Sequence, residues 1–259
     1  MGRIDEPHTR RSSQVKECSK SIARRLADPD FGHRYFVGEG LDVGGKPDPL
    51  AVYAELFSRV TAIRTWDVED GDGQLLAGVA DESFDFVHSS HCLEHLADPR
   101  VALHNWLRVL RPGGHLVFTV PDEDLYEQGV FPSGFNRGHR HTFTIFKASS
   151  WSPASINLLD LLRQLGEAAQ VVKIELLQRG YRFGLPRYDQ TLTPVAESGI
   201  EVVVRKRLES EITQGGRLPS AKANLSRETR IQLNQYRDDA ARMKRDNAEN
   251  PPFNNDAEL

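Results

Sequence analysis

The run from Phe84 to Pro121 constrains the fold of this chain more than any other segment. It begins with a short apolar, β-rich stretch, Asp85–Val87, and then turns polar, as happens where a buried parallel strand reaches its carboxyl end. Asp98 is a good N-cap for the helical pattern that follows, and His115–Val120 reads as a second buried strand. The order strand, helix, strand predicts an α/β fold in which ligands gather at the carboxyl ends of parallel strands.

Size, charge and cysteine content exclude several classes of protein. The chain has 259 residues, enough for one sizeable domain with extensions, and its net charge of -4 gives no field that favours nucleic acid. Two cysteines, Cys18 and Cys92, are too few for a disulfide framework and suit a reducing compartment. No apolar stretch is long enough to cross a bilayer, and the first residues lack the apolar core of a secretion signal. We therefore expect a cytoplasmic protein without nucleic-acid or membrane partners.

Further elements precede and follow this run. A first strand ends near Val43, a helix capped by Asp48 spans Pro49–Val60, and a second strand spans Thr61–Trp66. The stretch from Asp67 to Asp85 is too short for a full helix and a full strand, so the third β/α unit is expected to be shortened. Downstream, the pattern predicts a helix and a hairpin-like final pair of strands, at Ser155–Ala169, Val171–Leu177 and Ile200–Arg205.

Extra helices are expected at both ends of the chain. Val15–Ala27 reads as a lid or packing helix over the main domain, and Arg227–Arg245 as a charged helix. The latter carries a narrow apolar stripe, which favours docking on its own domain or on a twin subunit in a homodimer, formed by Leu233, Tyr236, Ala240 and Met243. The predicted division is an N-terminal tail and helix, a central domain and a C-terminal extension, at residues 1–32, 33–207 and 208–259.

The central motifs resemble a known family. The Leu93–His95 triplet (LEH) and the turn Arg108–Gly114 (RVLRPGG) are similar to those of class I S-adenosylmethionine-dependent methyltransferases of the type 11/23-like kind. The resemblance covers about residues 36–206. It implies a Rossmann-like, doubly wound, mostly parallel sheet with an antiparallel last strand, and S-adenosylmethionine as the cofactor.

The first turn is the expected cofactor loop. Asp42, Gly44 and Gly45 follow the family's pattern of an acid, any residue and a glycine, although Lys46 stands where the final glycine would be. Glycines let backbone N–H groups approach a ligand. Lys46 either pairs with the cofactor's carboxylate or is a solvated loop lysine.

Acidic residues near the second strand are expected to hold the nucleoside. Asp67 follows the strand directly and is the choice for the ribose hydroxyls, with Glu69 and Asp70 as competitors. The alternative is an acidic run that only solubilises a turn. The triplet Asp72, Gly73 and Gln74 resembles the family's element near the adenine amino group.

The end of the next strand is expected to flank the sulfonium, through Ser89 and His91. His91 and His95 stand four residues apart, a spacing that metal sites use, and the stretch resembles the ExxEH pattern of certain metal-assisted methyltransferases with His91 in place of the first Glu. Local hydrogen bonding of Glu94 and His95 that fixes the loop is the favoured interpretation, and no metal is assigned.

The long segment after Pro121 is the expected acceptor region. A histidine suits removal of a hydroxyl proton, so His139 and His141 are the candidate bases, the alternative being an ordinary exposed pair. Asp122–Asp124 is expected to cap a loop.

These residues and the resemblance predict methyl transfer from S-adenosylmethionine to a polar small molecule or glycan, at oxygen. A noncatalytic S-adenosylmethionine-binding partner protein is the alternative. A nicotinamide-dependent enzyme is less favoured because residues 41–48, LDVGGKPD, lack GxGxxG.

Overall fold

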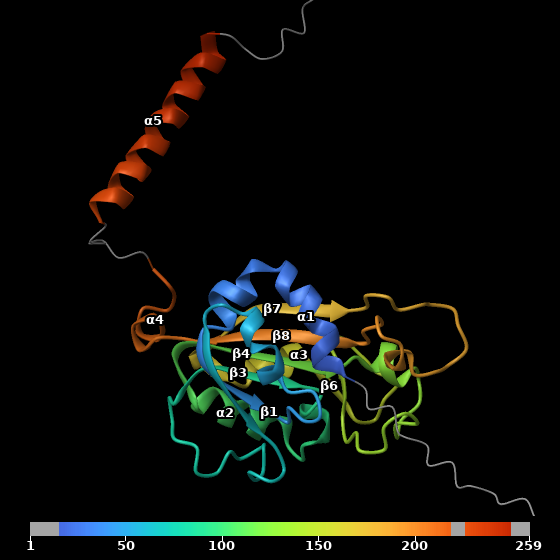
Figure 1. Ribbon diagram of the computed structural model, residues 1–259. Helices are drawn as coiled ribbons and strands as arrows, with labels where there is room; N and C mark the ends of the chain where they lie inside the picture. The colour runs from blue at the N-terminus through green and yellow to red at the C-terminus, as the bar shows by residue number, and fades with distance from the viewer. Residues whose placement is uncertain (1–15, 219–225, 250–259) are drawn as a thin grey trace, which may run out of the picture. The chain divides into compact units, whose positions relative to one another are not determined.

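A six-stranded sheet forms the centre of the protein in this computed structural model, which describes residues 16–218 and 226–249. Its strand order is β2-β1-β3-β4-β8-β7 (Figure 1). The strands are β1 (Gly38–Val43), β2 (Val60–Trp66), β3 (Phe84–Ser90), β4 (Leu110–Pro121), β7 (Ala169–Leu177) and β8 (Gly199–Lys206). Strands β2, β1, β3 and β4 run parallel, and β8 is antiparallel to both of its neighbours. The predicted Rossmann-like sheet with an antiparallel last strand is confirmed.

The third β/α unit is shortened, as the sequence predicts. Residues 67–83, between β2 and β3, form turns and coil without a helix or strand. Leu76 of this segment is fully buried, and the Trp106 indole of α2 (Pro99–Arg108) donates a hydrogen bond to the Gly73 carbonyl at 2.8 Å. The segment therefore packs against α2 as coil and leaves β2 at the edge of the sheet.

Capping explains where two of the predicted helices begin. Asp98 caps α2 by accepting hydrogen bonds from the amides of Arg100 and Val101, as predicted. The predicted Asp48 cap is wrong, because its carboxylate accepts instead from the Ser19 amide and the Tyr53 hydroxyl. The helix that follows is only a short 3-10 helix, η2 (Leu50–Leu56), without a side-chain cap.

The predicted helix over Ser155–Ala169 is shorter in the structure. Residues Ser155–Asn157 form strand β6, which pairs in parallel with β5 (Thr142–Thr144), and α3 then covers only Leu158–Arg163. The backbone N–H and C=O groups of residues 155–157, which the sequence predicted to lie in the first turn of the helix, pair with β5 instead. A 3-10 turn, η5 (Gly166–Ala168), leads into β7.

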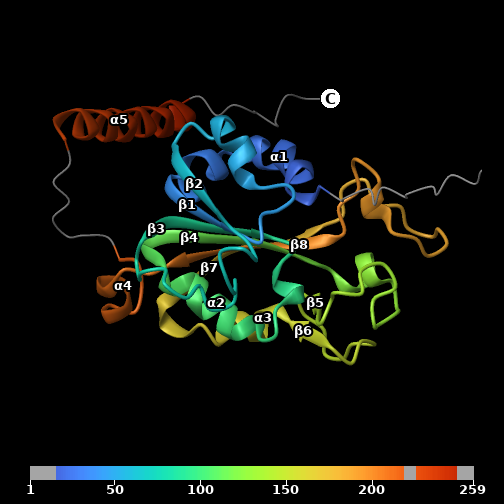
Figure 2. The same cartoon turned by 60° about the horizontal axis from the view of Figure 1, so that its bottom comes forward.

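Helices cover both faces of the sheet (Figure 2). On one face α1 (Glu17–Ala27) and the π-helical turn η1 (Phe31–Tyr35) bury apolar side chains against Phe86, Val117 and Val203 of the strands. On the other face α2 and α3 pack over the larger apolar cluster. The N-terminal helix is therefore a packing helix of the main domain, as the sequence predicts.

The chain divides into two compact units, with the boundary between Gly215 and Gly216. The short helix α4 (Glu209–Thr213) belongs to the first unit, where Glu211 pairs with Arg205 of β8. The second unit contains α5 (Arg227–Glu249), on which Tyr236 and Met243 are exposed. The side chain of Leu233 lies outside the described residues. No helix among the described residues is both long and apolar enough to cross a membrane.

Candidate functional site

A cavity of about 310 Å³ opens where β1 and β3 end, at the carboxyl edge of the parallel strands. Four parts of the chain line it: the glycine turn after β1, the start of α1, the loops after β3 and β4, and the loop between β7 and β8. The lining residues are Glu17, Cys18, Gly44, Gly45, Lys46, Pro47, Asp48, Ser90, His91, Glu94, His95, Tyr126, Asn136, His139 and Thr191. This is the edge at which ligands bind in folds of this class.

The turn after β1 has no room for side chains. Gly44 has a φ of +69°, and a Cβ there would lie 2.6 Å from the Cys92 sulfur. A Cβ on Gly45 would lie 2.4 Å from the Asp42 carboxylate. The turn therefore requires glycine, and it leaves the backbone open to a ligand in the cavity.

Asp42 is fully engaged inside the protein and does not line the cavity. One carboxylate oxygen accepts from the Leu50 amide at 2.7 Å, and the other is 2.6 Å from His88 Nδ1. Burial lowers the pKa of His88, so its ring is neutral at pH 7 and donates from Nδ1 to Asp42. Its Nε2 then accepts from Arg25 of α1 at 3.0 Å. The assignment of Asp42 to cofactor contact stays a prediction, and its visible role is to tie β1 to α1.

This chain of contacts continues to β8. The Arg25 guanidinium donates from Nε to Glu201 at 2.9 Å, and both side chains are completely buried. Arg24 of α1 binds the second oxygen of the same carboxylate at 2.6 Å. The pairs anchor α1, whose first residues Glu17 and Cys18 line the cavity.

Asp67 lies beside the glycine turn. Its carboxylate accepts hydrogen bonds from the Lys46 amide at 2.9 Å and from the Val68 amide at 2.8 Å. The competing acids are engaged elsewhere, since Glu69 pairs with the Lys46 ammonium and Asp70 accepts from the Asp67 amide. Asp67 does not itself line the cavity but binds Lys46, which does, and its contact with a ribose stays a prediction.

Four other predicted residues make internal contacts and do not line the cavity. Asp72 accepts from the Gln74 amide, and Gln74 accepts from the Asp98 amide through its side chain. The Gly73 carbonyl binds the Trp106 indole, and the Ser89 hydroxyl donates to the Val43 carbonyl. Their contact with a cofactor stays a prediction.

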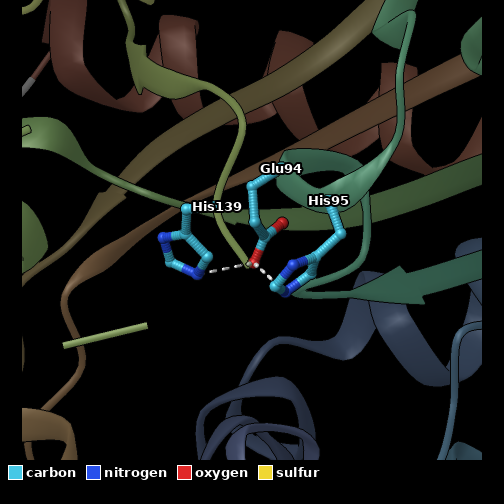
Figure 3. Close-up of side chains that lie close together, drawn as sticks. All are labelled: Glu94, His95 and His139. Carbon is cyan, nitrogen blue, oxygen red and sulfur yellow. Dashed lines mark ion pairs between the residues drawn. The ribbon is translucent and has the colours of Figure 1, made fainter. Parts of the chain in front are cut away.

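Polar side chains gather at the other end of the cavity (Figure 3). Glu94 lies on the 3-10 turn η3 (Leu93–His95), is completely buried, and points between the rings of His95 and His139. Its Oε1 is 4.0 Å from His95 Nε2 and 3.9 Å from His139 Nε2. Neither carboxylate oxygen has a hydrogen-bond partner among the described residues, and the local contact of this side chain is an ion pair with His91 Nδ1 at 3.5 Å in place of the predicted hydrogen bond. The loop is held instead by the Arg140 amide, which donates to the Glu94 carbonyl.

The two candidate bases are separated by the fold. His139 is buried at the cavity, and its Nδ1 is 2.7 Å from a carboxylate oxygen of Glu127 on the π-helical turn η4 (Glu123–Glu127). His141 is turned away and contacts the Leu96 carbonyl through Nε2 at 3.0 Å. Asp122 caps η4 through the amides of Asp124 and Leu125, as the sequence predicts.

Several residues of the site were missed by reasoning from the sequence. Glu127, which orients His139, stands in no motif, and Thr191 comes from the loop before β8. The helical pattern of α1 predicted packing but gave no signal that Glu17 and Cys18 face a cavity. Burial raises the pKa of Cys18 and of Cys92 to about 12, so neither thiol is a nucleophile at neutral pH.

Comparisons with known proteins agree with this geometry. Residues 45–118 match the family model of a methyltransferase domain. A solved S-adenosylmethionine-dependent methyltransferase of Archaeoglobus fulgidus has the same fold, with a TM-score of 0.50 and 16% identity over 74% of this chain and 94% of that one. An uncharacterized 37.1 kDa protein in transposon TN4556 of Streptomyces fradiae is 47% identical over 58 residues, which cover 22% of this chain and 16% of that protein.

The matched residues begin within the glycine turn, at Gly45, and run through β2, β3 and α2 to most of β4. Residues 45–118 thus match a methyltransferase domain, and the six-stranded sheet has the Rossmann-like arrangement of the Archaeoglobus fulgidus methyltransferase.

Proposed function

We propose that the protein transfers a methyl group from S-adenosylmethionine to a hydroxyl oxygen of a polar small molecule or a glycan. The observation that supports this is the asymmetry of the cavity, with a glycine turn at one end and Glu94, Tyr126 and His139 at the other. The first end admits a large ligand against the backbone. The second suits an acceptor rich in hydroxyl groups, because buried donors and acceptors need polar partners.

The residues present fit S-adenosylmethionine, which supplies an electrophilic methyl group on sulfur when bound. Gly44 and Gly45 leave the space that side chains would fill, and Asp67 stands at the adjacent strand end. A carboxylate has about four lone-pair sites, so Asp67 can accept ribose hydroxyls in addition to its two amide hydrogen bonds. Lys46 lines the cavity and its ammonium pairs with Glu69 at 3.0 Å, so in this proposal Lys46 is not assigned to the carboxylate of the cofactor.

In this proposal His139 takes the proton from the acceptor. A buried carboxylate at Nδ1 favours the tautomer that carries its hydrogen there, which leaves the Nε2 lone pair on the side of Glu94, at the lining of the cavity. Glu127 thereby positions the ring. A positioned base contributes about 10²- to 10⁴-fold to such a transfer.

Calorimetry with S-adenosylmethionine and its demethylated product tests the cofactor assignment. Asp67→Ala is expected to weaken binding about tenfold or more, because a hydrogen bond to a charged group contributes about 1.5–3 kcal/mol. Asp160→Ala, which removes an exposed carboxylate of α3, is the matched control and is expected to bind as wild type. Equal binding by the wild type and Asp67→Ala contradicts the ribose assignment.

Release of S-adenosylhomocysteine with a panel of sugars, polyols and phenols tests the reaction. We expect turnover with a hydroxylated acceptor, a loss of about 10²- to 10⁴-fold in His139→Ala, and unchanged cofactor binding in that variant. His104→Ala, an exposed histidine on α2, controls for loss of an imidazole.

The alternative, a noncatalytic S-adenosylmethionine-binding partner protein, makes a different prediction. It requires cofactor binding that depends on Asp67, together with no turnover of any acceptor and no effect of His139→Ala or His141→Ala on its interactions.

A further inference from the structure

We propose that Glu94, His95 and His139 form a binding site for a divalent first-row transition metal ion at the acceptor end of the cavity. One carboxylate oxygen and one ring nitrogen from each histidine lie within 4.8 Å of one another (Figure 3). The residues come from η3 and from the loop after η4, which the fold brings together. No single sequence motif contains the set.

The buried carboxylate of Glu94 is the strongest evidence. The residue has no exposed surface, and neither of its oxygens has a hydrogen-bond partner among the described residues. Its nearest ring nitrogens, on His91, His139 and His95, are ion-pair contacts at 3.5, 3.9 and 4.0 Å from Oε1. A buried carboxylate needs polar partners, and an ion bound between Glu94, His95 and His139 would bring a positive charge closer than these histidines do.

The distances are close to those of a coordination sphere. Glu94 Oε1 is 4.0 Å from His95 Nε2 and 3.9 Å from His139 Nε2. Ligand atoms at about 2.0–2.2 Å from a common ion are themselves about 3–4 Å apart. The distance between the two histidine nitrogens is at most 4.8 Å, so the three side chains have to move together by no more than about an ångström to complete the site.

The surroundings of His139 fit a ligand. Its Nδ1 contacts the buried Glu127 carboxylate at 2.7 Å, which directs Nε2 toward the site. Metal-binding histidines commonly donate their other ring N–H to a carboxylate in this way.

The donor set selects the ion. Two imidazoles and one carboxylate suit zinc, iron, cobalt or manganese, whereas magnesium and calcium prefer oxygen ligands. Three protein ligands leave at least one coordination position of the ion open. Because Glu94, His95 and His139 all line the cavity, that open position would face the acceptor.

This inference rests on the proposed function and deepens it. The acceptor's hydroxyl oxygen binds the ion, its O–H bond breaks, and the proton passes to water, because a bound divalent ion lowers the pKa of a coordinated hydroxyl. The oxygen then forms a bond to the methyl carbon while the carbon–sulfur bond breaks, which leaves the neutral thioether. With the ion bound, His139 Nε2 acts as a ligand, and proton removal no longer depends on it.

Titration of the metal-depleted full chain with Co²⁺, followed by visible absorption and by calorimetry, tests the site. The wild type is expected to bind one ion, and Glu94→Gln, His95→Ala and His139→Ala to bind at least tenfold more weakly. His141→Ala is the matched control, because it removes an imidazole two residues from His139 whose contacts, to the Leu96 carbonyl and Phe143, lie away from the three proposed ligands. Absence of a stoichiometric ion, or equal affinity in all three variants, overturns the proposal.

Thermal unfolding of Glu94→Gln distinguishes a metal ligand from a structural residue. The quantity to compare is the rise in melting temperature when excess Zn²⁺ is added to the metal-depleted protein. The wild type is expected to gain more than Glu94→Gln, because it binds the ion more tightly, whatever the substitution does to the metal-free melting temperature through lost contacts with His91, His95 and His139. An equal rise in the two proteins contradicts the proposal.

The remaining experiment separates this inference from the proposed function. If S-adenosylmethionine binds and methyl transfer continues at the same rate in a strong chelator, the role of the ion is refuted and the proposed function stands. If Co²⁺ binds at the three residues but S-adenosylmethionine does not bind, the proposed function fails while the metal site is supported.

Discussion

Glu201 of β8 is the buried partner on which the docking of α1 depends, and its replacement gives a quantitative test. The carboxylate has no exposed surface and binds both Arg24 and Arg25 of α1. Burial alone raises the pKa of Glu201, but the attraction of Arg25 and Arg24 outweighs it and lowers that pKa to about 2. A depression from 4.5 to that value corresponds to about 3 kcal/mol in favour of the folded state at neutral pH.

Glu201→Gln is therefore expected to lower the free energy of unfolding by about 3–5 kcal/mol at pH 7, because it leaves the buried Arg25 without its partner charge. The pH dependence has a defined sign. A lowered folded-state pKa contributes stability above the unfolded value of 4.5, and that stability is lost as the pH falls toward 2. The gap between wild type and variant should be constant from pH 8 to 5 and narrow by about 2 kcal/mol at pH 3.

Urea unfolding followed by circular dichroism at pH 7, 5 and 3 measures this gap. Glu175→Gln is a suitable control, because it removes a carboxylate from β7, the strand next to β8. The ion-pair partner of Glu175, Lys173, is partly exposed, unlike Arg25. A gap below 1 kcal/mol at pH 7, or one that widens as the pH falls, would refute the reasoning. Because α1 also lines the cavity through Glu17 and Cys18, the same variant should bind S-adenosylmethionine more weakly.

Three further predictions concern separate parts of the chain. Gly44→Ala should lower the free energy of unfolding by about 1–3 kcal/mol and weaken cofactor binding, because φ at Gly44 is +69° and the added Cβ meets Cys92. Urea unfolding and calorimetry measure the two effects. Gly78→Ala is the control for backbone strain alone, since φ there is +81° and nothing lies near the added Cβ. Burial raises the pKa of Asp122 to about 6, so the contribution of Asp122 to the free energy of unfolding falls as the pH rises from 4 to 6. Asp122→Asn keeps an acceptor for the capped amides of Asp124 and Leu125. It should be more stable than the wild type by up to about 3 kcal/mol at pH 7, and should show no such gain at pH 4. The exposed Tyr236 and Met243 of α5 suit a homodimer, which light scattering should detect and Tyr236→Ser should weaken; a strict monomer contradicts that prediction.

The sequence determined the elements whose causes are local. Asp98 caps α2 because its side chain reaches amides only two and three residues away. The apolar runs that became β3 and β4 and the short segment at 67–83 were readable for the same reason, since strand length and connection length are properties of the chain itself. The glycine turn and the place of Asp67 followed from their position at strand ends.

Only the tertiary structure decided which side chains meet. Asp42 was expected to contact a cofactor, and in the structure its oxygens accept from Leu50 and His88. His88 in turn contacts Arg25, which binds Glu201, a residue 176 positions from Arg25 in the sequence. His139 and His141 are equivalent in the sequence, yet only His139 meets Glu127 and the cavity.

The site at Glu94 shows the division most clearly. The sequence placed Glu94 and His95 on a loop after a strand, where local hydrogen bonds were the expected use of the carboxylate. The fold instead buries the carboxylate without a donor and brings His139 to it from another loop. Hydrogen bonds and ion pairs depend on distances in space, and these cannot be read from positions along the chain. The sequence therefore predicted the edge of the sheet at which the cofactor is expected, whereas the packing of the loops determined which side chains meet at the acceptor end of the cavity.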